Sequence, residues 1–122
     1  MAAPNIVNVT TITGKSIAVG LSTTAQVGIL TNSSGSNKVF KINTIRATNI
    51  DGSVTADISV GFNTVGAATT QYIARTIAVP ADAALVVVDK TSAIYLEENQ
   101  QIVAQASADG DIDMFISYED IS

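Results

Sequence analysis

The segment VTADISVGF at residues 54–62 constrains the fold most, because its apolar residues alternate with polar or small ones. Successive side chains of a β-strand point to opposite faces of a sheet, so a period of two predicts a strand with one buried face and one solvated face. The alternation places Val54, Ile58 and Phe62 in the core. No segment of the chain keeps apolar residues at helical spacing for three turns.

Turn signals recur about every 8–14 residues along the rest of the chain, which is typical of short strands joined by tight connections. The segment KVFKINTIRATNI at residues 38–50 is predicted to form a hairpin with residues 54–62 across the turn DGS. Its alternation changes phase between Ile42 and Ile45, which predicts a β-bulge.

Many short strands separated by turns indicate a β-sandwich or a jelly roll. A chain of 122 residues fits one domain that can bury a core without cross-links. We therefore predict one all-β domain over residues 1–122, a jelly-roll-like β-sandwich of about eight strands with an extended N-terminal arm at residues 1–9. Near the C-terminus, Ile112 and Ile116 are also expected in the core.

The sequence contains no cysteine and no histidine. The chain therefore cannot form disulfides or thiolate metal sites. It also lacks histidine, the commonest general base. Glu97 and Glu98 could supply an acid and a base, but adjacent residues of a strand face opposite sides of a sheet. We predict that the protein is not an enzyme and that it uses no cofactor.

The C-terminal segment ASADGDIDMFISYEDIS contains five carboxylates and no base. Asp109, Asp111 and Asp113 resemble the start of a calcium loop, but the glycine comes second instead of sixth, and an aspartate stands where that loop has glutamate. Asp-Gly between two strand-like runs predicts a hairpin turn that joins residues 101–108 to 111–121. The three aspartates stay a candidate cation site, and the hairpin is the preferred interpretation.

The net charge is −5, which disfavours nucleic-acid binding as the main function. Residues 1–50 hold four bases and no acid, whereas residues 51–122 hold two bases and all eleven acids. This asymmetry predicts that Lys38, Lys41 and Arg46 face an acidic surface of a neighbouring subunit or shell. The alternative is that the two halves neutralise each other inside one fold.

The start of the chain, MAAPNIVNV, has neither the basic nor the apolar region of a signal peptide. No apolar run approaches the length that spans a bilayer. We expect a protein that is made in a cytoplasm and has no membrane partner.

Residues 77–122, IAVPADAALVVVDKTSAIYLEENQQIVAQASADGDIDMFISYEDIS, resemble small virion structural proteins of tailed bacteriophages, especially marine and cyanobacterial ones. The likeness lies in a Pro-Ala-Asp turn, an apolar strand, IYLEE, a polar strand, an Asp-Gly turn and a terminal SYED. The segments MAAPNIVNVTTITGKS and NSSGSNKVFKIN extend it to nearly the whole chain. The resemblance implies a β-sandwich that acts in the virion as a capsid decoration (cement) protein.

The implied partners are the major capsid protein or other virion proteins, together with further copies of this chain, a trimer being favoured. The alternatives are a tail, neck or baseplate component, or a host-surface adhesin that binds carbohydrate through Tyr72, Tyr95 or Tyr118. The candidate interface residues come from the N-terminal arm and the basic half of the chain: Pro4, Ile6, Val7, Val9, Lys38, Lys41 and Arg46.

Overall fold

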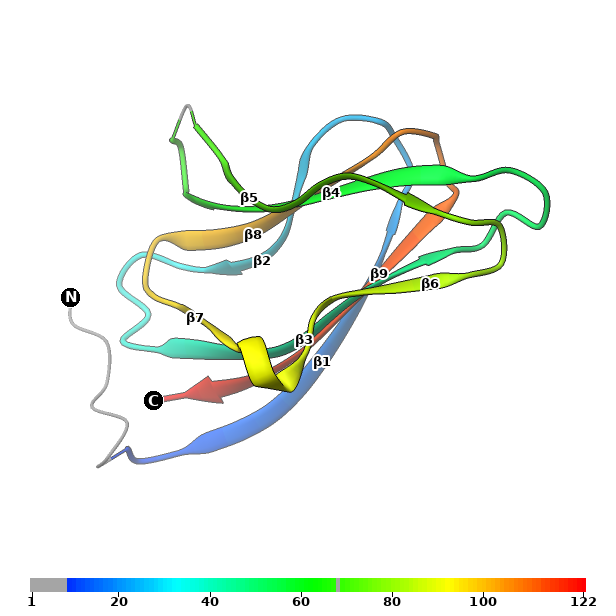
Figure 1. Cartoon of the computed structure of the whole chain (residues 1–122). Coiled ribbons are helices and arrows are strands. Elements are labelled where there is room, and N and C mark those ends of the chain that lie inside the picture. Colours follow the sequence, from blue (N-terminus) through cyan, green and yellow to red (C-terminus); the bar gives the residue numbers. More distant parts are fainter. Residues whose placement is uncertain (1–8, 68) are drawn as a thin grey trace.

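The computed structural model describes residues 9–67 and 69–122, which form nine β-strands and one short 3-10 turn. Figure 1 shows the strands in two facing layers. The elements are β1 (Ile12–Leu21), β2 (Val27–Asn32), β3 (Val39–Asn49), β4 (Ala56–Thr64), β5 (Gln71–Val79), β6 (Ala84–Val88), η1 (Lys90–Ser92), β7 (Ile94–Leu96), β8 (Gln100–Ala106) and β9 (Ile112–Ile121). The predicted all-β sandwich is confirmed. No helix among the described residues has the length and apolar character to cross a membrane.

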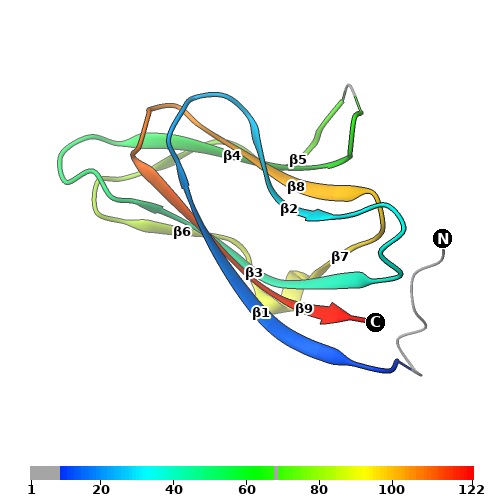
Figure 2. The same cartoon turned by 180° about the vertical axis from the view of Figure 1, so that it is seen from behind.

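The strands pair as one long hairpin folded on itself. β4 pairs with β5, β3 with β6, β2 with β8 and β1 with β9, and every pair is antiparallel. The arms of this hairpin roll into two sheets. Sheet A has the order β1-β9-β3-β6, with β7 beside β3, and sheet B has the order β2-β8-β4-β5. This interleaving is the jelly-roll arrangement, and Figure 2 shows it from behind.

Both hairpins predicted from the sequence are wrong. β3 lies in sheet A and β4 in sheet B, and β8 and β9 are likewise in different sheets. The turns themselves exist: Gly110 has φ +72°, and the Asp51 carboxylate accepts hydrogen bonds from the backbone N–H groups of Ser53 and Val54. A turn signal marks where the chain reverses. It does not say which sheet receives the next strand, and here both turns carry the chain across the sandwich.

The predicted bulge in β3 is confirmed, because its register against β9 shifts between Ile42 and Thr44. The bulge turns Ile45 and Ala47 to the same inner face as Phe40 and Ile42, and all four side chains are buried. The extra residue therefore keeps one apolar face directed at the core along an eleven-residue strand.

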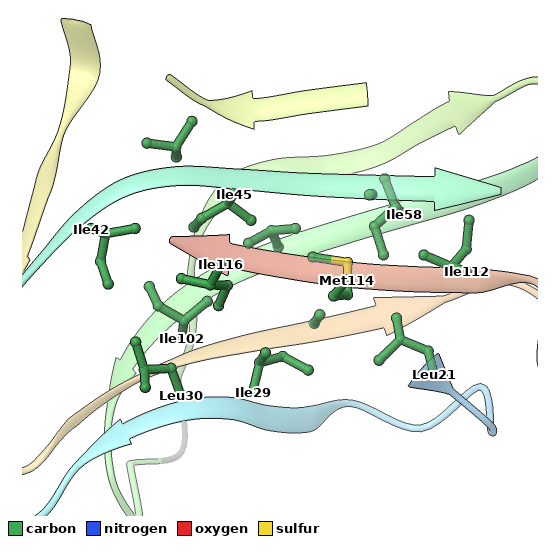
Figure 3. Close-up of a cluster of buried hydrophobic side chains, with 14 of the residues drawn as sticks. Leu21, Ile29, Leu30, Ile42, Ile45, Ile58, Ile102, Ile112, Met114 and Ile116 are labelled. Carbon is green, nitrogen blue, oxygen red and sulfur yellow. The ribbon is translucent and has the colours of Figure 1, made fainter. Parts of the chain in front are cut away.

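The core lies between the two sheets and consists mainly of aliphatic side chains from both (Figure 3), with Phe40 and Tyr118 as its buried aromatic members. Of the five predicted members, Ile58, Ile112 and Ile116 are fully buried, and Phe62 is partly buried against the same cluster. Val54 is a correction, since its side chain is 53% exposed. Strand β4 begins at Ala56, so the apolar alternation continues into a loop that does not cover the core.

Candidate functional site

One end of the sandwich is acidic. It is formed by the connections at residues 22–26, 50–55, 80–83 and 107–111, which contain Asp51, Asp82, Asp109 and Asp111 and no lysine or arginine. Backbone hydrogen bonds tie these loops together: the N–H of Ile50 donates to the carbonyl of Asp111 (2.7 Å), and that of Asp82 to the carbonyl of Asp51 (3.1 Å). We call this the acidic end.

The opposite end, which we call the lysine end, contains Lys15, Lys38, Lys41 and Lys90, mixed with carboxylates. Asp120 of β9 is the buried member of this group, with 6% of its surface exposed. Its Oδ2 accepts hydrogen bonds from the Lys15 Nζ at 2.8 Å and the Lys38 Nζ at 3.1 Å. These two lysines neutralise a carboxylate of the acidic half within the chain, which is the alternative that the charge asymmetry left open.

Burial alone would raise the pKa of Asp120, because a charged carboxylate loses hydration inside the sandwich. The hydrogen bonds from Lys15 and Lys38 outweigh that cost and hold the pKa below its ordinary value. The same hydrogen bond raises the pKa of Lys15. Asp120 therefore stays ionised and forms an ion-pair cluster with Lys15 and Lys38. This cluster links β1, β9 and the start of β3.

The remaining basic candidates lie on the outer face of sheet A. Lys41 is half-buried between its cross-strand neighbours Glu119 and Tyr95. Arg46 is exposed at the centre of the sheet and is flanked by Phe115 of β9 and Val86 of β6.

Phe115 and Val86 are 47% and 54% exposed, although both are large apolar residues on strands of sheet A. With Ala18, which pairs with Phe115, they form a line across four strands, which we call the outer row: Ala18, Phe115, Arg46 and Val86. A shallow hollow of about 170 Å³ borders it and is lined by Ser16, Thr44, Arg46, Phe115, Ile116 and Ser117. An aromatic ring beside an arginine is the composition that protein interfaces favour.

A second hollow, of about 200 Å³, lies on the outer face of sheet B. The guanidinium of Arg75 stacks over the ring of Tyr72 at 4.6 Å. Thr76, with φ +52°, lies beside them at a bulge, where its N–H donates to the Ser59 hydroxyl (2.9 Å). The lining is mainly polar: Asp57, Ser59, Tyr72, Arg75, Thr76, Gln105, Ala106 and Ser107.

The three candidate sugar-binding tyrosines are not brought together. Tyr118 is buried and packs against the ring of Phe40, with centroids 5.1 Å apart. Tyr72 is exposed on sheet B, and Tyr95 is exposed on β7 of sheet A. Only Tyr72 lines one of the two hollows described above.

The structure does not bring the candidate cation ligands together either. Asp109 is exposed in the turn before β9, and Asp113 lies on β9 beside Gly20 of β1. Within residues 9–67 and 69–122, no three carboxylates are grouped so that they could hold a metal ion.

Most of the predicted N-terminal arm falls outside the described residues, whereas the C-terminal strand is described to its end. Pro4, Ile6 and Val7 of the predicted arm lie outside the described residues, and Val9 is half-buried. The C-terminus is held by its own chain, since Ser122 exchanges backbone hydrogen bonds with Thr11.

Sequence reasoning missed two features. Phe115 could have been found, because it occupies an outward position in the alternation Ile112, Met114, Ile116, where an aromatic residue is unexpected. The ion pairing of the buried Asp120 carboxylate had no local signal, since its partners are 105 and 82 residues away.

The fold defines the chain as a jelly-roll β-sandwich protein. A chain of the acidic stable capsid structure of the Helicobacter pylori bacteriophage KHP30 has a similar fold, with a TM-score of 0.53 and 12% sequence identity over 94% of this chain and 90% of that one. No protein-family model matches the sequence, and no curated protein matches it.

Proposed function

We propose that this protein is a structural component of a bacteriophage virion, and specifically a decoration (cement) protein on the exterior of the head, in contact with the major capsid protein. Three findings support the proposal: the jelly-roll fold, its likeness to a chain of a phage capsid structure, and the outer row on sheet A. The marine or cyanobacterial origin implied by the sequence resemblance belongs to the same proposal. The role is one of contact and support, not catalysis.

The outer row is the observation that carries this role. Phe115 offers an exposed ring, and Arg46 beside it offers a planar guanidinium that can bind a carboxylate through two parallel hydrogen bonds. Exposed anchors of this type contribute a large share of binding free energy when a partner covers them. Sheet A is a firm support for them, because the inner neighbours Ile45 and Ile116 are fully buried.

Particles stripped of this protein provide the test. Purified wild-type protein should rebind them, and Arg46→Glu and Phe115→Ser should each bind at least about tenfold more weakly. Arg75→Glu is the matched control, because it makes the same charge change on the other sheet. If Arg75→Glu abolishes rebinding while both sheet A variants bind like wild type, the contact face is wrong.

Stripped particles should also lose resistance to heat or osmotic shock and regain it on rebinding. The number of copies per particle distinguishes the head from other locations. A decoration protein is present in many copies, whereas a tail, neck or baseplate component is present in few. Quantitative mass spectrometry of purified virions measures that number, and a low copy number would move the assignment to the tail.

The predicted N-terminal arm belongs to the same proposal as a contact with a neighbouring chain. Deleting residues 2–9 should weaken rebinding to particles more than it lowers thermal stability. A collapse of the thermal transition would instead assign these residues to the domain's own fold.

The hollow beside Tyr72 and Arg75 favours one alternative function, carbohydrate binding at the host surface. An aromatic ring surrounded by hydroxyl, amide and carboxylate groups suits a sugar ring. A glycan array should then show binding that Tyr72→Ala removes and Tyr95→Ala leaves intact. No binding by the wild-type protein would eliminate this alternative.

A further inference from the structure

The two sheets of the described chain have four outer edges, and three of them are irregular. β2 is short and shifts register against β8 between Gly28 and Leu30. β5 shifts register twice against β4 and contains Thr76 at φ +52°. The edge formed by β6 and β7 is interrupted by η1. Only β1 is regular, with ten residues in continuous register from Ile12 to Leu21.

This contrast matters because an open strand edge is a template for further strands. Natural proteins blunt such edges with bulges, short strands, interruptions or charges. In the described chain, three edges have features of this kind. The β1 edge is instead long and unbulged, and Lys15 is its one charged residue. An edge of this kind, next to three protected ones, indicates an interface.

The hydrogen-bonding groups of the β1 edge can be assigned. Thr11 and Ser122 exchange both backbone hydrogen bonds, at 3.0 and 2.9 Å. In an antiparallel ladder such bonded pairs alternate with unbonded ones, so every second residue of β1 points its N–H and C=O away from β9. The outward-pointing residues are Ile12, Gly14, Ser16, Ala18 and Gly20.

We propose that a second copy of this chain pairs with this edge, β1 against β1 in antiparallel orientation about a twofold axis, so that the two A sheets become one. Ile17 and Val19 support a second copy of this chain as the partner at the β1 edge. Both side chains face the core and pack on it, yet both stay partly exposed at the margin of the sandwich. The register that sets Ile17 opposite Ile17 of the second copy lets these side chains cover one another.

The charges are compatible with this pairing. In that register Lys15 lies opposite Val19 of the second copy, so no like charges face each other across the new ladder. Antiparallel pairing also sets the acidic end of each copy next to the lysine end of the other. The lysine end mixes its lysines with carboxylates, so it repels the acidic end of the second copy less than another acidic end would. The parallel arrangement would place the two acidic ends together and is therefore disfavoured. The proposed assembly is a twofold dimer and so differs from the trimer that the sequence resemblance favours.

The test uses the purified full-length chain and needs no virion. Sedimentation should give a concentration-dependent dimer, and hydrogen exchange should show that the amides of Ser16 and Ala18 become protected as the dimer forms. Ser16→Pro removes an N–H that β9 does not use, so it should yield a folded monomer. Ser16→Ala keeps that N–H and should dimerise like wild type.

Ala18→Lys adds a charge to the same edge and tests the proposal independently if the proline variant does not fold. A wild-type protein that stays monomeric, or a trimer, would overturn the proposal. So would Ser16→Pro and Ala18→Lys variants that still dimerise. Protection of Ser16 and Ala18 in the dilute monomer would show that the chain covers this edge itself, which also overturns it.

Discussion

Asn32 and Asn49 perform the same task at opposite ends of the sandwich. Each is the last residue of a strand, each is fully buried, and each precedes a connection that crosses from one sheet to the other. The Asn32 amide donates to the carbonyls of Lys38 and Leu96, on the sheet A side. The Asn49 amide donates to the carbonyl of Val54 in the next connection and to that of Val79 in sheet B.

Replacing Asn49 by alanine should therefore lower the free energy of unfolding by about 2–4 kcal/mol, because two backbone carbonyls lose their donor and one of these bonds is buried. The Asn49 side-chain oxygen also accepts from the N–H of Asp51 at 2.9 Å, and that bond is lost too. Denaturant unfolding of the two proteins measures the difference.

Asn43→Ala is the matched control. Asn43 is half-buried, and its amide makes one hydrogen bond, to the Glu119 carboxylate at 3.0 Å. Its loss should cost about 1 kcal/mol or less. Equal costs for Asn43→Ala and Asn49→Ala would contradict the crossover role of Asn49.

Ile58 and Val54 test where the core ends. They share one apolar alternation, but Ile58 is fully buried and Val54 is mostly exposed. Ile58→Ala should destabilise the protein by about 2–5 kcal/mol, whereas Val54→Ala should change stability by about 0.5 kcal/mol or less. Thermal or denaturant unfolding measures both. Similar losses at the two positions would place Val54 in the core after all.

Ile58 and Val54 also show which features of the fold can be predicted from local sequence patterns. Alternation and turn residues are local properties, so the strands, the bulge in β3 and the core residues Ile112 and Ile116 could be predicted from them. Which strand pairs with which is not local. β1 pairs with β9 at the far end of the chain, and nothing near either strand specifies its partner.

The candidate interface residues also depend on strand pairing that local sequence patterns do not specify. Arg46 was predicted as an interface residue and is exposed on sheet A. Lys38 is predicted with it and is also bound to Asp120 within the chain, because the register of β9 against β3 brings the two together. A charge asymmetry along the sequence cannot distinguish these cases, since only the pairing of distant strands decides which charges meet.

Asp120 makes stability depend on pH. The carboxyl pKa is about 3.9 in an unfolded chain and lower in the folded protein. The carboxylate therefore contributes its full stabilisation above about pH 4 and loses it as the pH falls through the folded value. Asp120→Asn should cost about 1–3 kcal/mol at neutral pH, and the gap between the two proteins should narrow under acid. Unfolding curves at several pH values measure this gap.

Asp109→Asn is the comparison for that experiment, because Asp109 is exposed in a turn and forms no ion pair within the described residues. Its replacement should leave the stability at neutral pH almost unchanged. A constant gap between wild type and Asp120→Asn from neutral pH to strong acid would show that the two lysines do not hold the carboxylate charged.

Gly61 is a position where the lack of a side chain lets the chain fold back over sheet B. A Cβ there would collide with the Thr70 methyl group and lie 3.2 Å from the carbonyl oxygen of Gln71 and 3.3 Å from a Val103 methyl group. Gly61→Ala should therefore destabilise the protein by about 1–3 kcal/mol through overpacking. Denaturant unfolding measures the loss.

A second substitution separates this collision from a general intolerance of Gly61 to change. Thr70→Ser deletes the colliding methyl group but keeps the hydroxyl, which accepts hydrogen bonds from the amides of Asn63 (3.0 Å) and Gln26 (3.1 Å). The double variant should regain part of the lost stability. The contact of the new Cβ with the Gln71 carbonyl should account for the loss that remains. Additive losses in the double variant would mean that the methyl group is not the obstacle.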